Sequence, residues 1–273
     1  MTINCKGTLV DLSSPKVMGI LNITPDSFYD GGKYKNESKI LHQTEKMLTE
    51  GATFIDVGAY SSRPGAAHIS EDEELNRILP VIDLLIKEFP EILISVDTFR
   101  AKIANETVQR GASIINDISG GNMDEKMFST ISNLNVPYIV MHMLGTPQNM
   151  QKNPVYKNIT QEVISFFAEK IFQLHQLKVN DIIIDVGFGF GKTIAHNFEL
   201  LQNLSLFKSL DAPILAGVSR KSMLYKTLDT SAKEALNATT SANTIALLNG
   251  ANILRVHDVK EAVEAVKIVE QVL

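Results

Sequence analysis

Some residue types are scarce in this chain, and each scarcity excludes a class of protein. Among the 273 residues there is one cysteine, Cys5, which excludes an internal disulfide and leaves no cysteine pair for a metal site. Positive charge is not in excess, because the formal net charge is −5. This argues against binding nucleic acid through a general basic field. No apolar run approaches the ~18–20 residues that a membrane-spanning helix needs.

The remaining composition is that of an ordinary globular protein. Hydrophobic residues make up 44% and charged residues 21% of the chain, unlike the low hydrophobicity and high net charge of disordered proteins. Residues 1–14 contain a single lysine and no long apolar segment, so we expect no secretory signal. We therefore expect a cytoplasmic protein with neither a membrane nor a nucleic acid as its partner.

Short apolar runs recur along the whole chain, and each is followed by a segment with helical periodicity. Continuous runs such as residues 182–184 are typical of parallel strands that are covered on both faces. The eight predicted strands are residues 17–22, 53–58, 92–98, 113–119, 137–142, 181–187, 213–219 and 252–257. Ser70 with Glu73, and Ser231 with Glu234, have the capping-box spacing that predicts the start of a helix.

Eight successive strand–helix units predict an α/β fold, a (β/α)8 TIM barrel that forms a single domain over residues 1–273. The alternative is a doubly wound open sheet. The uninterrupted series of units, without a sign of an antiparallel strand, favours the closed barrel. The active site of such a barrel is expected at the C-terminal ends of the strands.

Polar residues stand at the C-terminal end of each predicted strand. These residues are Asn22, Asp56, Asp97, Asn116, Asp117, His142, Asp185, Ser219, Arg220, Lys221, Arg255, His257 and Asp258. A single Asp or Asn at such a place is often a turn former or a helix cap, which is our interpretation of Asp117 and Asp258. Burying several ions at one barrel rim costs several kcal/mol per ion unless partners exist. A ligand is the natural partner.

Three of these residues are suited to a flat heterocycle. Asp97, Asn116 and Asp185 offer several hydrogen-bond acceptors and one amide donor group. A site that accepts hydrogen bonds from the N–H groups of a substrate can discriminate by ~10⁴–10⁵ against analogues that lack them. The pattern therefore predicts a ring rich in N–H groups.

A second set is cationic and suited to an anion. Arg63, Lys221, Arg255 and His257 can bind a carboxylate or a diphosphate. The side-chain oxygen of Asn22 can join a Mg²⁺ shell, because this ion prefers oxygen ligands and shares them with phosphate groups. Together, the two sets predict a heterocycle that is joined to a diphosphate leaving group.

Residues 187–193 contain a glycine-rich stretch that resembles a phosphate-binding loop. The Walker A spacing would require glycine at position 186, where this chain has valine, so that motif is absent. We interpret the stretch as a loop that lets the backbone approach a ligand, with Phe188 packed in the core and Phe190 against the pocket. Residues 219–222 (SRKS) follow an apolar strand, which favours a place in the site over a surface turn.

The ordered series of motifs resembles the dihydropteroate synthase family of folate biosynthesis. The matching stretches are residues 18–28 (MGILNITPDSF), 63–66 (RPGA), 95–98 (SVDT), 115–117 (IND), 187–192 (GFGFGK), 219–222 (SRKS) and 255–258 (RVHD). They span residues 18–258, which is nearly the whole chain. Several motifs in a fixed order are a more specific signal than any one of them.

The resemblance implies a transferase that condenses 4-aminobenzoate with (7,8-dihydropterin-6-yl)methyl diphosphate. The products would be 7,8-dihydropteroate and diphosphate. The resemblance further implies Mg²⁺ as the cofactor, a homodimer, sensitivity to sulfonamides, and loops at residues 24–35 and 61–68 that close over the site. Two other functions are weighed against it: a pterin-binding methyltransferase barrel and a pterin-binding protein without catalysis.

The resemblance also implies roles for single residues. The pterin would contact Asp97, Asn116, Met141, Asp185, Phe190, Gly217 and Lys221. The diphosphate would contact Asn22, Arg63, Arg255 and His257, with the metal on Asn22. The aminobenzoate would contact Phe28, Ser61, Ser62, Pro64, Lys221 and Ser222. The catalytic group would comprise Lys221, Arg63, Arg255 and His257.

The chain departs from the usual family pattern in the segment before residue 63 and after Asp185. Tyr60 stands where the family often has an acidic residue, and Ser62 where it often has threonine. Val186 stands where proline is common. Ser62 keeps the hydroxyl group but lacks a methyl group, which predicts a looser aminobenzoate pocket. None of these changes affects the residues expected at the pterin or the diphosphate.

Overall fold

A computed structural model describes residues 1–23, 33–61, 68–150 and 153–272 of the chain. Eight parallel strands form a closed barrel in the order β10-β3-β4-β5-β6-β7-β8-β9. The strands are β3 (Lys16–Asn22), β4 (Phe54–Gly58), β5 (Ile94–Asp97), β6 (Ile114–Asp117), β7 (Tyr138–Met141), β8 (Ile182–Asp185), β9 (Ile214–Ala216) and β10 (Ile253–Val256). The prediction of a (β/α)8 barrel is confirmed, and each barrel strand lies within one of the predicted ranges or one residue beyond it.

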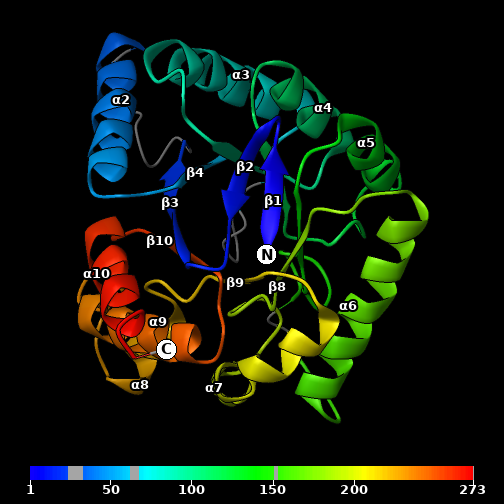
Figure 1. The fold of residues 1–273 in the computed structure, drawn as a ribbon, viewed down its shortest axis with the longest axis vertical. Helices are drawn as coiled ribbons and strands as arrows, with labels where there is room; N and C mark the ends of the chain where they lie inside the picture. The colour runs from blue at the N-terminus through cyan, green and yellow to red at the C-terminus, as the bar shows by residue number, and fades with distance from the viewer. Residues whose placement is uncertain (24–32, 62–67, 151–152, 273) are drawn as a thin grey trace.

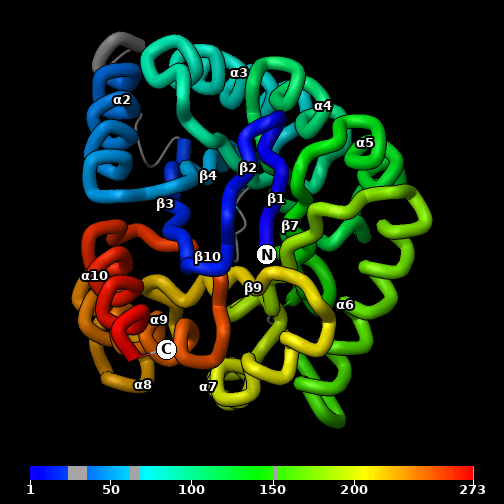
Figure 2. The backbone as a smooth tube through the Cα atoms, viewed as in Figure 1, coloured from blue at the N-terminus to red at the C-terminus, as the bar shows by residue number. Residues whose placement is uncertain are grey.

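Helices surround the barrel, as the ribbon and the backbone tube show (Figures 1 and 2). They are α2 (Lys33–Thr49), α3 (Glu71–Glu88), α4 (Ala101–Gln109), α5 (Met127–Leu134), α6 (Ile159–Gln176), α7 (Ile194–Gln202), the 3₁₀ helix η1 (Leu204–Leu210), α8 (Ser222–Thr227), α9 (Leu236–Leu248) and α10 (Val259–Val269). Within the described ranges, none of these helices has the length and apolar character to cross a membrane.

The two predicted helix starts have different outcomes. Ser70 is the N-cap of α3, and its side chain accepts a hydrogen bond from the backbone N–H of Glu73, as predicted. The second prediction is wrong, because the helix begins only at Leu236. Ser231 Oγ donates to Glu234 Oε2 at 2.9 Å. The hydroxyl group therefore donates within a turn where a capping box would require it to accept from the backbone.

A β-hairpin that the sequence analysis did not predict precedes the barrel. Strands β1 (Thr2–Cys5) and β2 (Thr8–Asp11) pair antiparallel. Lys6 and Gly7 form the turn, with φ of 52° and 96°. The hairpin lies in front of the barrel strands in Figure 1. Its buried side chains pack with barrel residues in one cluster, which comprises Ile3, Cys5, Val10, Leu12, Met18, Phe54, Ile114, Ile139, Ile183, Leu215 and Ile253. The hairpin therefore closes the N-terminal end of the barrel.

The barrel interior changes from apolar to polar along the strands. Successive side chains of a strand point to opposite faces, so residues two apart point to the same face. On β4, Phe54 packs against the hairpin cluster, and Asp56 two residues later bonds to Arg255. On β8, Ile183 belongs to the same cluster, and Asp185 follows it. The polar side chains thus meet at the C-terminal end of the barrel.

Candidate active site

Arg255 of β10 joins two carboxylates in the middle of the polar end of the barrel. Its Nε donates to Asp56 Oδ2 at 2.6 Å and its Nη2 to Asp97 Oδ2 at 2.9 Å. Asn116 Nδ2 donates to the same oxygen of Asp56 at 3.2 Å. Strands β4, β5, β6 and β10 therefore each contribute one side chain to a connected network.

Burial and charge act in opposite directions on this network. Burial raises the pKa of Asp97, and the carboxylate of Asp56 raises it too, whereas Arg255 lowers it. Burial lowers the pKa of Arg255, but Asp56 and Asp97 outweigh burial and raise that pKa above its ordinary value. Arg255 is therefore a permanent cation between two carboxylates. Such a cation can bind an anionic group of a substrate with little change in the surrounding structure.

The network leaves hydrogen-bond acceptors without partners inside the barrel. Within the part of the chain that the structure describes, Asp56 Oδ1, Ser95 Oγ and Asn116 Oδ1 are buried side-chain atoms without a hydrogen-bond partner. Leaving a buried polar atom unpaired costs about 1–3 kcal/mol. The carboxylate and amide oxygens can be satisfied by the N–H groups of a bound ring, as the predicted heterocycle would provide.

Asp185 of β8 and Lys221 after β9 form a second part of the site next to Gly217. A Cβ atom placed on Gly217 would lie 3.8 Å from Asp185 Oδ2 and 3.8 Å from Lys221 Nζ. The backbone N–H of Gly187 donates to Asp185 Oδ1 at 2.8 Å. Glycine at position 217 therefore leaves space between an acid and an amine, and a flat ligand can occupy this space.

Residues of the glycine-rich loop contact the amine of Lys221. Its Nζ donates to the backbone carbonyl of Phe188 and lies 4.9 Å from the centre of the Phe190 ring. Burial lowers the pKa of Lys221 to about 8, although Asp185 raises it. Burial also raises the pKa of Asp185, and Lys221 opposes this effect. At neutral pH, Lys221 therefore still carries its proton and can donate to a ligand.

An apolar cluster lines the same end of the barrel. It comprises Tyr60, Phe99, Ile118, Met141, Met143 and Met150, and it is packed against Ile69, Met123 and Phe190. Met141 is the last residue of β7 and is almost fully buried. Met141 and Phe190, which were both predicted at the pterin, thus share one apolar wall beside the polar network.

The predicted diphosphate residues are only partly within the described ranges. A Cβ atom placed on Gly58 would lie 3.7 Å from Asn22 Oδ1 and 3.7 Å from Asp97 Oδ2, so these two oxygens face the same point. His257 is exposed, and its Nδ1 lies 3.0 Å from Ser219 Oγ. Arg63 lies outside the described residues.

The predicted aminobenzoate residues are described least completely. Phe28, Ser62 and Pro64 lie outside the described residues, as do most of the two predicted closing loops. Ser222 is the first residue of α8 and is half-buried next to Lys221. Ser61 is half-buried at the end of the segment that follows β4. The roles of all these residues remain predictions.

Known proteins that are similar to this chain bind pterins, as the geometry of the site would allow. The profile of the family described as pterin binding enzyme matches residues 18–257. The dihydropteroate synthase of Escherichia coli (strain K12) is 42% identical over 275 residues, which cover 100% of this chain and 97% of the relative. The chain belongs to the dihydropteroate synthase family of pterin-binding enzymes.

Solved structures support the same assignment. The Yersinia pestis dihydropteroate synthase, in a sulfonamide drug complex, has a TM-score of 0.93 and 42% identity, and the match covers 100% of this chain and 99% of that one. The Xanthomonas albilineans enzyme with 4-aminobenzoic acid has a TM-score of 0.92 and 35% identity, over 99% and 97% of the two chains. The resemblance to dihydropteroate synthases that the motifs indicate is therefore confirmed, and with it the transferase class.

In this member of the dihydropteroate synthase family, two of the residues at predicted strand ends, Asp117 and Asp258, bond to other protein side chains. Asp117 accepts hydrogen bonds from Ser119 and from the buried hydroxyl group of Tyr138. Asp258 forms an ion pair with Arg220 at 2.8 Å. The interpretation of Asp117 and Asp258 as residues outside the site agrees with these contacts.

Two residues that were not assigned to the site lie at its centre or border. Asp56 is fully buried and links Arg255 to Asn116. Lys192 is 4% exposed, and its Nζ lies 3.0 Å from His142 Nδ1. The sequence signal for Asp56 was an acidic residue within a predicted strand, and in the structure Asp56 is the third residue of β4. The contact of Lys192 with His142 had no signal in the sequence, because it joins two loops whose residues are 50 positions apart in the chain.

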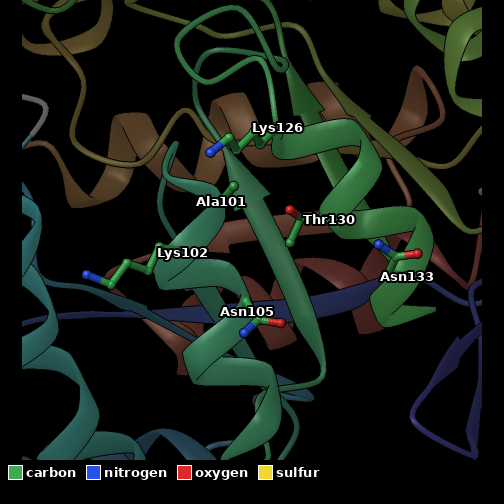
Figure 3. A pocket seen from close by; sticks show the side chains of 6 residues that line it. All are labelled: Ala101, Lys102, Asn105, Lys126, Thr130 and Asn133. Carbon is green, nitrogen blue, oxygen red and sulfur yellow. The ribbon is translucent and has the colours of Figure 1, made fainter.

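A separate cavity lies on the outside of the barrel between α4 and α5 (Figure 3). It has a volume of about 240 Å³ and is lined by Ala101, Lys102, Asn105, Lys126, Thr130 and Asn133. Lys102 is paired there with Glu71 and Asp72 of α3. The backbone N–H of Ala101 is bonded to Asp124. The cavity contains none of the predicted site residues of this dihydropteroate synthase family member.

Proposed function

We propose that this chain condenses 4-aminobenzoate with (7,8-dihydropterin-6-yl)methyl diphosphate to give 7,8-dihydropteroate and diphosphate. The observation that carries the proposal is the meeting of Asp97, Asn116, Asp185, Lys221 and Arg255 at one end of a barrel. These residues come from five parts of a chain that belongs throughout its length to the dihydropteroate synthase family.

The two acids and the amide recognise the pterin. Asp185 and the free oxygen of Asn116 accept hydrogen bonds from the ring and amino N–H groups, and Lys221 donates to a ring acceptor. Met141 and Phe190 cover the apolar faces of the ring. Because the carboxylates are negative, they also stabilise the positive charge that develops on the pterin methylene group as its C–O bond breaks.

The cations stabilise the leaving group. When the C–O bond of the methylene group breaks, its electron pair leaves with the diphosphate, whose negative charge increases. Arg255 is held in place by Asp56 and Asp97. We assign Arg63 and His257 to the same cationic group. Removal of one well-placed donor from such a site typically costs about 3–4 kcal/mol in the transition state.

The protein supplies no nucleophile for this reaction. The amine of 4-aminobenzoate is neutral at pH 7 and attacks the methylene carbon with its own lone pair, after which it loses a proton. Xanthomonas albilineans dihydropteroate synthase binds 4-aminobenzoic acid, and the Yersinia pestis enzyme binds a sulfonamide. We propose that this chain binds the same two ligands. The contacting residues would be Phe28, Ser61, Ser62, Pro64, Lys221 and Ser222.

Mg²⁺ fits the oxygen atoms at the rim. Mg²⁺ usually takes one or two protein oxygens and shares the rest of its shell with water and substrate phosphates. Asn22 Oδ1, which faces the same point as Asp97 Oδ2, would be such a ligand. When bound, the ion would neutralise part of the diphosphate charge. We propose that Asn22 would hold the ion together with oxygen atoms of the substrate diphosphate.

The chain also carries a surface suited to the predicted homodimer. Helices α7 and α10 both pack against α9. Phe198 of α7, Ile245 and Leu248 of α9 and Ile268 of α10 are 37%, 45%, 49% and 69% exposed. Large exposed apolar patches mark interaction surfaces, and we propose these four side chains as homodimer contacts. We expect sedimentation equilibrium to give a dimer, and Ile245→Glu to weaken it.

The test of the function is diphosphate release by the purified chain. Release should require the pterin diphosphate, 4-aminobenzoate and Mg²⁺, and dihydropteroate should form in equal amount. Asp185→Ala and Lys221→Ala serve as inactive controls. Folded protein that releases no diphosphate would contradict the proposal. Equal affinity for dihydropterins with and without the diphosphate would instead favour the methyltransferase alternative, and binding without turnover would favour the non-catalytic one.

A further inference from the structure

Lys192 is a buried lysine at the end of the glycine-rich loop, and the reaction described above does not use it. Its side chain is 4% exposed. Burying an ammonium group costs several kcal/mol unless its hydrogen bonds and charge are satisfied. The contacts that satisfy this group therefore indicate what it does.

Three acceptors surround the ammonium group. Lys192 Nζ lies 3.0 Å from His142 Nδ1 and donates to the backbone carbonyls of His142, at 3.2 Å, and Phe190, at 2.9 Å. Burial lowers the pKa of Lys192 to about 7, although Asp185 raises it, so the group carries its proton on the acidic side of neutral pH. In that form the lysine has three donors and no acceptor, so Nδ1 of His142 accepts and its ring is neutral. Burial lowers the pKa of His142 to about 2, which agrees with a neutral ring.

These contacts join the loop after β7 to the loop after β8. At Gly187, φ is +70°, and a Cβ atom would lie 2.0 Å from the carbonyl oxygen of His142. The hydroxyl group of Tyr156 donates to the Gly191 carbonyl at 2.8 Å. The two loops thus touch along their backbones, and Lys192 donates to carbonyls of both.

The loop that Lys192 holds makes direct contacts with the pterin site. The Phe188 carbonyl accepts from Lys221 Nζ, and the Gly187 N–H donates to Asp185 Oδ1. A Cβ atom on Gly187 would lie 3.3 Å from Lys192 Nζ. The amine of Lys192 is therefore close to the backbone that holds Asp185 and Lys221.

We propose that Lys192 is a positioning residue of the pterin site, which fixes residues 187–191 against His142 and places a positive charge behind Asp185. The proposal rests on the function proposed above and assigns a task to the glycine-rich motif. Lys192 acts through Asp185 and Lys221, and the pterin need not touch it.

The charges that face Asp185 come from three elements. They are Lys221 after β9, Arg255 of β10 and Lys192 after β8, and each lowers the pKa of Asp185, which burial raises. The neighbouring His142 after β7 is neutral. Loss of the positive charge of Lys192 removes one of three opposing effects, so the pKa of Asp185 should rise. Because the anionic form binds the pterin, the acidic limb of the pH profile should then move to higher pH.

The test compares Lys192→Met, Lys192→Arg and wild type in the full chain. KM and kcat are measured for both substrates, and kcat/KM for the pterin diphosphate is followed from acidic to neutral pH. Lys192→Met should reduce this kcat/KM by up to about 100-fold, because misplaced groups can cost that much. Its acidic limb should move to higher pH, and KM for 4-aminobenzoate should stay within about twofold of wild type.

Lys192→Arg separates the charge from the geometry. Arginine keeps the charge but cannot place three donors around one atom, so the acidic limb should stay in place while KM for the pterin rises. Lys6→Met is the control for loss of a lysine away from the site, because Lys6 lies in the hairpin turn and donates to the carbonyl of Val108 in α4. It should leave both KM values and the pH profile unchanged.

The outcomes are distinguishable from failure of the proposed function, which would appear as inactivity of the wild type. A wild-type acidic limb in folded Lys192→Met would overturn the charge effect. A wild-type pterin KM in Lys192→Arg would overturn the positioning role. If circular dichroism finds Lys192→Met unfolded, the result for Lys192→Arg decides.

Discussion

Arg255 Nε donates to Asp56 Oδ2 at 2.6 Å, although the two residues are 199 positions apart in the chain. The carboxylate of Asp56 is fully buried and also accepts from Asn116. The side chain that would bind the pterin and the side chain that would bind the diphosphate therefore depend on the same oxygen atom.

Asp56→Asn should strongly destabilise the protein. Removal of one partner from a buried ion pair typically costs roughly 3–5 kcal/mol, because the other charge stays buried. Since Arg255 keeps its pair with Asp97, we expect a loss at the lower end of this range, about 3 kcal/mol. Urea denaturation followed by circular dichroism measures the free energy of unfolding. Asp83→Asn is the matched control, since Asp83 pairs with Arg110 on the surface, where both side chains are about half exposed. An exposed pair contributes about 1 kcal/mol or less. Equal losses in the two variants would contradict a buried pair at Asp56.

The basic limb of the pH profile should belong to Lys221. Burial lowers the pKa of Lys221 to about 8, so its donor ammonium form is lost as the pH rises through this value. We expect kcat/KM for the pterin diphosphate to fall above about pH 8. Lys221→Arg should move this limb to higher pH, because a guanidinium group keeps its proton to above about pH 12, although the maximal rate should be lower. An unchanged basic limb in Lys221→Arg would assign the limb to another group.

Gly187→Ala should be far more harmful than Gly7→Ala. Both glycines have a positive φ, at +70° and +96°, so both substitutions carry backbone strain of about 1–2 kcal/mol. Only the Cβ atom at position 187 would also meet a backbone atom, the His142 carbonyl oxygen at 2.0 Å. In Gly187→Ala, the melting temperature should fall clearly and the KM for the pterin should rise. Gly7→Ala should be destabilised only by the backbone strain, and its KM should stay unchanged. Similar melting temperatures and KM values would contradict the close approach of the two loops.

Cys5 should be unreactive in the native protein. Burial raises the pKa of its thiol to about 12, and Cys5, the last residue of β1, is 2% exposed on the buried face of the hairpin. The thiolate is the reactive form, so a disulfide reagent should label Cys5 only after unfolding. Because this is the one cysteine of the chain, the labelling rate reports opening of the hairpin. Rapid labelling of native protein would show that the hairpin does not cover the barrel end.

The barrel could be predicted because its strands are buried on both faces. Runs such as Ile182–Ile184 have no polar residue, and their order with the helices leaves little choice of topology. The hairpin was missed because its strands have four residues each and five of these eight residues are exposed. Its signal was Lys6-Gly7 between short alternating runs, which is weak without knowledge of the barrel end that it covers.

The candidate site could be predicted as a set of residues but not as a network. Strand-end position identified Asp97, Asp185 and Arg255, and the structure brings them to one rim. The depth of Asp56 and the contact of Lys192 with His142 could not be read from the sequence. Both depend on which side chains point inward and on how two loops pack, and these are properties of the tertiary fold.

A crystal structure of the chain with (7,8-dihydropterin-6-yl)methyl diphosphate and Mg²⁺ tests the central claim most directly. We predict that the ring lies between Asp185 and Asn116 with its amino groups on their oxygens, and that the diphosphate reaches Arg255. A pterin bound elsewhere, or a ring whose N–H groups do not meet these oxygens, would contradict the account.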